Sequence, residues 1–217
     1  MNLEQARFNM VEQQIRTWEV LDPAVLDLLY AVPREDFVPA AYRKLAFADM
    51  EIPIGEGESM MAPRIEARIL QALSLRKTDR VLEVGTGSGY LTALLARCAA
   101  HVYSLEIRPG LAAVGRANLE RHGADNVTLE VADGARGDPK RAPYDAIVLT
   151  GSTPVLPAAL REQLAPGGRL FAVVGEPPVM VARLITCTVP GAFGSEELFD
   201  TVLAPLVNAE RPARFQF

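Results

Sequence analysis

The spacing of apolar residues changes near position 75 of the chain. Up to that point it follows a helical period, so we predict helices over Met1–Thr17, from Pro23 onwards behind an Asp22 N-cap, and again from Pro63 onwards. The stretch between Pro53 and Pro63 holds two glycines and shows no period, which predicts a loop.

Beyond position 80, short apolar runs alternate with helical patterns. Strands are predicted over Arg80–Val84, Val102–Leu105, Val127–Val131, Tyr144–Thr150, Arg169–Val174, Met180–Thr188 and Glu197–Pro205. Helices are predicted over Tyr90–Ala99, Pro109–His122 and Pro157–Leu164. This alternation predicts an α/β fold, a Rossmann-like, doubly wound, mostly parallel seven-stranded sheet with helices on both faces and an N-terminal helical extension. Because no long helix separates the last strands, that end of the sheet is expected to be antiparallel.

Composition narrows the class of protein. The 217 residues suffice for one compact unit, and a net charge of −5 without a Lys/Arg run argues against nucleic acid as a partner. The N-terminus is not that of a signal peptide, and no apolar stretch reaches the ~20 residues needed to span a membrane. We therefore expect a cytoplasmic protein, a monomer or small homo-oligomer. Its two cysteines and two histidines do not cluster with acids, so no metal site is expected.

A glycine-rich turn follows the first predicted strand. It reads Glu83-Val84-Gly85-Thr86-Gly87-Ser88-Gly89-Tyr90 and joins a strand to a helix, where backbone N–H groups can face a ligand. The dinucleotide pattern G-x-G-x-x-G fails, because its third glycine would fall on Tyr90 or Thr92. Alternating glycines behind an acid resemble the first motif of class I methyltransferases, which bind S-adenosyl-L-methionine and release S-adenosyl-L-homocysteine.

Two further acids follow predicted strands at the positions that this resemblance requires. Glu106 ends the second strand, where a carboxylate can accept both ribose hydroxyl protons. Asp133 follows the third strand, and the resemblance implies that its carboxylate contacts the adenine amino group. The cofactor-binding residues implied in this way are Glu83, Gly85, Thr86, Gly87, Ser88, Gly89, Glu106, Ile107, Asp133 and Gly134.

The flanking segments are similar to those of protein-L-isoaspartate O-methyltransferases. Phe37-Val38-Pro39, Ala46-Phe47-Ala48-Asp49 and Ile52-Pro53-Ile54-Gly55 follow the order F-V-P, A-Y-x-D and L-P-I-G that is common in that family. The similarity reaches Ala204-Pro205-Leu206-Val207 near the end of the chain. It implies methylation of isoaspartyl carboxylates in damaged peptides or proteins. Residues 1–75 would then form a helical lid with the substrate loop, and residues 76–217 the cofactor domain.

One position departs from the family pattern. Where the family reads G-Q-T-I-S-Q-P, this chain reads Gly57-Glu58-Ser59-Met60-Met61-Ala62-Pro63. We assign Ser59 and Met61 to the catalytic site, although Met61 stands at the family's serine position and cannot donate a hydrogen bond. Glu56 and Glu58 would repel an anionic substrate. Three interpretations stay open: isoaspartyl methyltransfer, methyltransfer to another acceptor, and cofactor binding without turnover.

Overall fold

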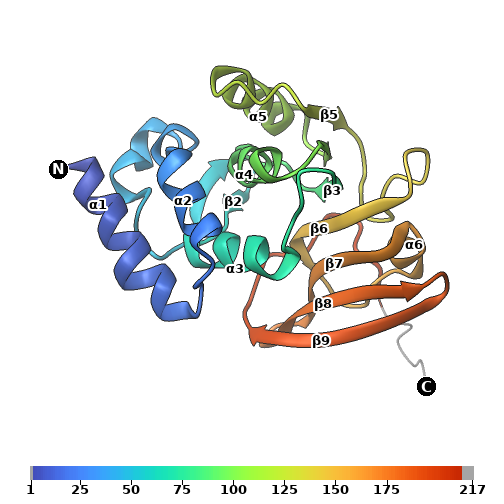
Figure 1. The fold of residues 1–217 in the computed structure, drawn as a ribbon. Coiled ribbons are helices and arrows are strands. Elements are labelled where there is room, and N and C mark those ends of the chain that lie inside the picture. Colours follow the sequence, from blue (N-terminus) through green and yellow to red (C-terminus); the bar gives the residue numbers. More distant parts are fainter. Residues whose placement is uncertain (1, 212–217) are drawn as a thin grey trace.

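A computed structural model describes residues 2–211 of the chain, which fold around a seven-stranded sheet (Figure 1). Its strand order is β5-β4-β3-β6-β7-β8-β9. The parallel strands are β5 (Val127–Val131), β4 (His101–Glu106), β3 (Arg80–Val84), β6 (Tyr144–Thr153) and β7 (Leu164–Glu176). The antiparallel strands β8 (Val179–Val189) and β9 (Ala192–Asp200) complete the sheet, which confirms the predicted fold class.

Helices cover both faces of the sheet, and neighbouring side chains of β3 point to opposite faces. Val81 points into the larger hydrophobic cluster, with side chains of α3 (Pro63–Leu73) and α4 (Tyr90–Cys98). Leu82 points the other way and packs with Leu160 of α6 (Ala158–Glu162). Helix α5 (Pro109–Arg121) packs beside α4 and over β5.

An N-terminal extension packs on the outer side of α3 and α4 (Figure 1). It contains α1 (Leu3–Asn9), a π-helical segment (Met10–Ile15) and α2 (Pro23–Ala31), followed by 3-10 turns. The predicted helical structure over Met1–Thr17 is confirmed from Leu3 onwards, although the hydrogen bonding widens at Met10 and tightens again at Arg16; Met1 itself lies outside the described residues. The Asp22 cap is confirmed, since its side chain accepts the Ala24 N–H at 2.9 Å.

The segment before α3 is a hairpin rather than the predicted loop. Strands β1 (Ile52–Gly55) and β2 (Glu58–Met60) pair antiparallel, with Ile52 opposite Met60. Strands this short carry too few alternating positions to be separated from a loop by their sequence pattern. The hairpin passes through Met61 and Ala62 directly into α3.

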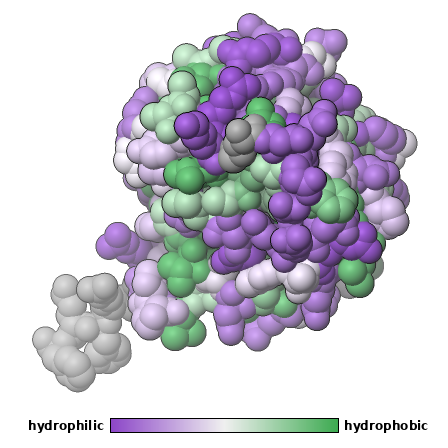
Figure 2. Space-filling view, turned by 90° about the vertical axis from the view of Figure 1, so that its left-hand side faces the viewer, coloured by the Kyte–Doolittle hydropathy of each residue, from purple (hydrophilic) through white to green (hydrophobic). Residues whose placement is uncertain are grey.

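The end of the sheet also differs from the prediction. Strand β9 begins at Ala192 and ends at Asp200, earlier than expected, because the turn at Gly191 lets the chain reverse immediately after β8. Residues 201–211 leave the sheet, and among them Pro205 forms an isolated bridge with Ser152. None of the helices in residues 2–211 has the length and hydropathy to cross a bilayer. Polar side chains cover most of the face that carries the N-terminal helices (Figure 2).

Candidate functional site

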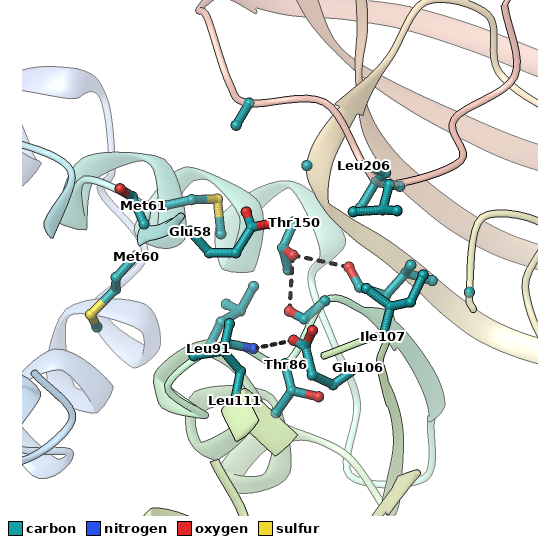
Figure 3. A pocket seen from close by; sticks show the side chains of 18 of the residues that line it. Glu58, Met60, Met61, Thr86, Leu91, Glu106, Ile107, Leu111, Thr150 and Leu206 are labelled. Atoms are coloured by element: carbon teal, nitrogen blue, oxygen red, sulfur yellow. Dashed lines mark hydrogen bonds between the residues drawn. The ribbon is translucent and has the colours of Figure 1, made fainter. Parts of the chain in front are cut away.

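A cavity lies at the carboxyl ends of β3, β4 and β6, under the β1–β2 hairpin. It encloses about 990 Å³ of space, a figure that includes volume open to solvent. Figure 3 shows Glu58, Met60 and Met61 on one side and Thr86, Glu106 and Ile107 on the other. In open α/β sheets, ligands bind at this edge.

The glycine turn after β3 forms one wall of this cavity. Gly85 has φ +97°, and a Cβ there would lie 2.1 Å from the Thr150 hydroxyl oxygen, so only glycine allows this approach of β6. Gly89 also has positive φ, but it lies against Gly115 of α5 and does not line the cavity. In this structure Gly89 packs against α5, and its assignment to the cofactor stays a prediction.

Glu106 is held at the cavity by two backbone groups. The Gly87 N–H donates to its Oε2 at 2.8 Å, and the Arg108 N–H donates to Oε1 at 3.0 Å. An ionised carboxylate offers about four acceptor positions. Each oxygen thus keeps capacity for a further donor, such as a hydroxyl of a bound ribose. This arrangement of Glu106 and of the turn residues that face the cavity suits a nucleoside ligand.

Glu83 of β3 lies behind the glycine turn. Its side chain is fully buried, accepts hydrogen bonds from the Thr92 hydroxyl at 2.5 Å and the Ser104 hydroxyl at 2.6 Å, and does not line the cavity. Burial raises the pKa of this carboxyl to about 8. Glu83 thus supports the turn from behind, and its assignment to the cofactor stays a prediction.

The remaining residues of the predicted cofactor set line the cavity. Asp133 accepts the Ala135 N–H at 2.9 Å and the Asn208 side-chain amide at 2.8 Å, which fixes its carboxylate at the rim. Gly134 lies so close to Val84 that a Cβ would approach its methyl group to 2.7 Å. The predicted residues that line the cavity are Gly85, Thr86, Gly87, Ser88, Glu106, Ile107, Asp133 and Gly134.

The opposite wall contains both residues assigned to catalysis. Ser59 is exposed at the cavity, whereas the Met61 side chain is only 7% exposed. The Met61 carbonyl accepts a hydrogen bond from Arg34 Nη2 at 2.6 Å. Arg34 is fully buried and also forms an ion pair with Glu66 of α3. Glu66 itself lines the cavity. Burial disfavours the charged form of the Glu66 carboxyl more than the neighbouring Arg34 favours it, so the pKa of Glu66 is raised to about 7.

Glu58 does not present the uncompensated charge that we expected. Arg108 Nε donates to its Oε1 at 2.7 Å, and Arg108 Nη2 lies 2.5 Å from the same oxygen. This pairing joins residues that are fifty positions apart, so the sequence pattern gave no signal for it. The expected repulsion of an anionic substrate by Glu58 is corrected, because a cation neutralises it.

Some lining residues were missed by the sequence reasoning. Thr150 donates to the Val84 or the Gly85 carbonyl, each at 2.9 Å, and it follows the apolar run of β6, where a strand-end rule would have found it. Leu203 to Val207 close the cavity from the C-terminal side. Within residues 2–211, no group of three or more His, Cys, Asp or Glu side chains could hold a metal ion.

Comparisons with known proteins agree on one family. The family model described as protein-L-isoaspartate(D-aspartate) O-methyltransferase matches residues 5–210. A relative of that name from Roseiflexus castenholzii is 42% identical over 96% of this chain and 94% of its own length. Another from Methanoculleus marisnigri is 47% identical over 78% and 77%. A Plasmodium falciparum crystal structure, described as such an enzyme with S-adenosyl-L-homocysteine, shares the fold with TM-score 0.79 and 22% identity, covering 95% of this chain and 99% of its own.

Proposed function

This chain belongs to the protein-L-isoaspartate(D-aspartate) O-methyltransferase family, and we propose that it methylates the free carboxylate of isoaspartyl residues in damaged proteins, using S-adenosyl-L-methionine. The strongest support within the molecule is one cavity that has Glu106 and the glycine turn on one wall and the hairpin with Ser59 on the other. The methyl ester would then collapse to a succinimide, which allows return to aspartate. We place this activity in the cytoplasm.

We assign the cofactor to the half of the cavity that is formed by the strand ends of the sheet. Glu106 would accept the ribose hydroxyls, and Asp133 would accept from the adenine amino group. Gly85 and Gly87 of the glycine turn line this half of the cavity. Residues 76–217 carry these groups, and residues 1–75 supply the lid and the acceptor hairpin.

The chemistry asks the protein for placement rather than proton transfer. S-adenosyl-L-methionine supplies an electrophilic methyl group on its sulfonium. A free carboxylic acid has a pKa near ~4, so the acceptor is already an anion at neutral pH and needs no general base. As its oxygen forms the new bond to the methyl carbon, the carbon–sulfur bond breaks. The residues around it therefore act by aligning the two reactants.

Ser59 is the hydroxyl that this half of the cavity offers to the acceptor carboxylate. Its side chain is exposed at the cavity, two positions before the place where the family has serine. Arg34 holds the backbone of this segment through the Met61 carbonyl. We assign the orientation of the carboxylate to the Ser59 hydroxyl and to the backbone that Arg34 fixes.

A second candidate function is methyltransfer to an acceptor other than an isoaspartyl carboxylate. It is favoured by Met61, which places a thioether where the family has a hydrogen-bond donor. Glu51 and Glu66 also line this wall, so its polar groups suit an acceptor that donates hydrogen bonds better than an anion.

Methylation of a synthetic peptide tests the proposed function. The chain is incubated with methyl-labelled S-adenosyl-L-methionine and an isoaspartyl peptide, with the aspartyl isomer as matched control. Incorporation of a base-labile methyl ester into the isoaspartyl peptide alone is expected. Calorimetry with S-adenosyl-L-homocysteine accompanies this assay. Cofactor binding without ester formation would favour another acceptor or a protein without turnover.

A further inference from the structure

The tip of the β1–β2 hairpin is tied to the segment that follows Glu106. The ion pair between Glu58 and Arg108 joins the hairpin to the residue just before α5. The backbone N–H of the same Arg108 donates to Glu106. One residue therefore contacts the carboxylate assigned to the ribose through its main chain and the acceptor hairpin through its side chain.

A second contact lies beside this ion pair. The Glu56 carboxylate rests on the first turn of α5, where a Cβ on Gly110 would lie 1.9 Å from Glu56 Oε1. The first turn of a helix favours a nearby anion. Glu56 adopts φ +52° at the hairpin turn. The absence of a side chain at Gly110 makes room for this contact.

We propose that Glu58 and Arg108 are positioning residues that latch the acceptor hairpin over bound cofactor, with Glu56 and Gly110 completing the contact. The hairpin supplies Ile54, Glu58 and Ser59 to the cavity wall, so its position decides both how easily the cofactor leaves and where the acceptor lies. This inference rests on the proposed function. The family usually has a neutral glutamine at this position. In this chain the ion pair with Arg108 requires the negative charge of Glu58.

Release of S-adenosyl-L-homocysteine from the full chain tests the latch. Glu58→Gln and Arg108→Gln are each expected to raise the dissociation rate about 2- to 5-fold, the range for partly exposed ion pairs. The double variant is expected to match either single variant, because the same contact is lost. Raising the salt concentration is expected to speed release from the unmodified chain and to have little effect on Glu58→Gln.

Gly110→Ala separates the latch from general stability. Alanine favours the helix more than glycine does, so this variant is expected to melt at a higher temperature. Its Cβ displaces the Glu56 carboxylate, so it is nevertheless expected to release S-adenosyl-L-homocysteine faster. Arg183→Gln is the control, because it breaks an ion pair with Glu197 on β8 and β9 that does not touch the cavity.

The outcomes separate the inference from the function on which it rests. Unchanged release rates in Glu58→Gln, Arg108→Gln and Gly110→Ala, with tight binding by the unmodified chain, would overturn the latch alone. Failure of the unmodified chain to bind S-adenosyl-L-homocysteine would overturn both the latch and the proposed function. Faster release with no isoaspartyl methylation would support the latch and count against the acceptor assignment.

Discussion

Arg34 and Glu66 form an ion pair whose side chains are only 1% and 2% exposed, beneath the hairpin segment that carries Met61. Arg34 also donates to the carbonyls of Met61 and Ala46 and stacks over the Tyr90 ring at 5.0 Å. The pair thus joins the N-terminal extension, the acceptor hairpin and the glycine turn in one buried contact.

Breaking this pair on one side is expected to destabilise the fold strongly. Arg34→Met or Glu66→Leu leaves the other charge buried without a partner, a loss of about 3–5 kcal/mol in the free energy of unfolding. The double variant removes both charges and is expected to lose less than the sum of the two. Urea unfolding of the three variants measures this, and additive losses would contradict a coupled pair.

Replacing Glu106 is expected to weaken cofactor binding. In Glu106→Gln, one side-chain oxygen becomes an NH₂ group that cannot accept a hydrogen bond from a ribose hydroxyl. Loss of a hydrogen bond to a charged group costs about 1.5–3 kcal/mol, or roughly 10- to 100-fold in the dissociation constant of S-adenosyl-L-homocysteine. Calorimetry measures the constant. Glu120→Gln, an exposed position on α5, is the matched control and is expected to bind normally.

Gly85→Ala tests the close approach of β6 to the glycine turn. Gly85 combines positive φ with a Thr150 oxygen 2.1 Å from the position of a Cβ, whereas Gly123 has positive φ and open space. Gly123→Ala is expected to lose about 1–2 kcal/mol through backbone strain alone. Gly85→Ala is expected to lose more, and to lose cofactor binding as well. Equal unfolding free energies for the two variants would mean that the contact with Thr150 is unimportant.

The buried carboxyl of Glu83 predicts a dependence of stability on pH. Its pKa rises from an ordinary 4.5 to about 8 on folding, so its contribution is fully present below pH 4.5 and is lost as pH rises towards 8. The slope from one such group is about 1.4 kcal/mol per pH unit. Glu83→Gln removes this slope while its side-chain oxygen can still accept from Thr92 and Ser104.

Subtracting the pH profile of Glu83→Gln from that of the unmodified chain isolates the Glu83 contribution. Glu66, whose pKa is raised to about 7, has the same sign and remains in both proteins. The difference in unfolding free energy is expected to shift in favour of the variant between pH 5 and pH 8. A difference that stays constant over this range would show that Glu83 is ionised in the folded state at all these pH values.

Met61→Ser restores the hydroxyl at the family's serine position. If an isoaspartyl carboxylate is the acceptor, the added donor is expected to raise kcat/KM by about 10- to 100-fold, the value of one hydrogen bond to a charged group. Ser59→Ala is expected to lower the activity of the unmodified chain and to matter less in the Met61→Ser background. Unchanged turnover of the isoaspartyl peptide in Met61→Ser would favour the second candidate function.

The sequence predicted what depends on local pattern and missed what depends on contacts between distant segments. Strand β5 has its predicted ends, and the Asp22 cap and the antiparallel sheet edge follow from turn and helix chemistry. Glu83 was assigned to the ligand because the motif places an acid there. Which face of β3 carries that side chain, and that Thr92 and Ser104 would enclose it, depends on how three elements pack.

The acceptor wall of the cavity was predicted less well from the sequence than the cofactor wall, because it depends on contacts between distant segments. The hairpin strands are too short for alternation to identify them, and β3, α4 and β4 lie between Glu58 and its partner Arg108 along the chain. Arg34 gave no signal, because an arginine among polar residues suggests a surface position rather than the buried one it occupies.

The cavity is built from two kinds of structure, and this has an evolutionary consequence. Its cofactor wall consists of buried strand ends, where a substitution disturbs the sheet itself. At its acceptor wall the hairpin exposes Ser59, and a substitution at such an exposed position changes stability little. Descendants of one ancestral enzyme can therefore exchange acceptor residues without refolding the sheet.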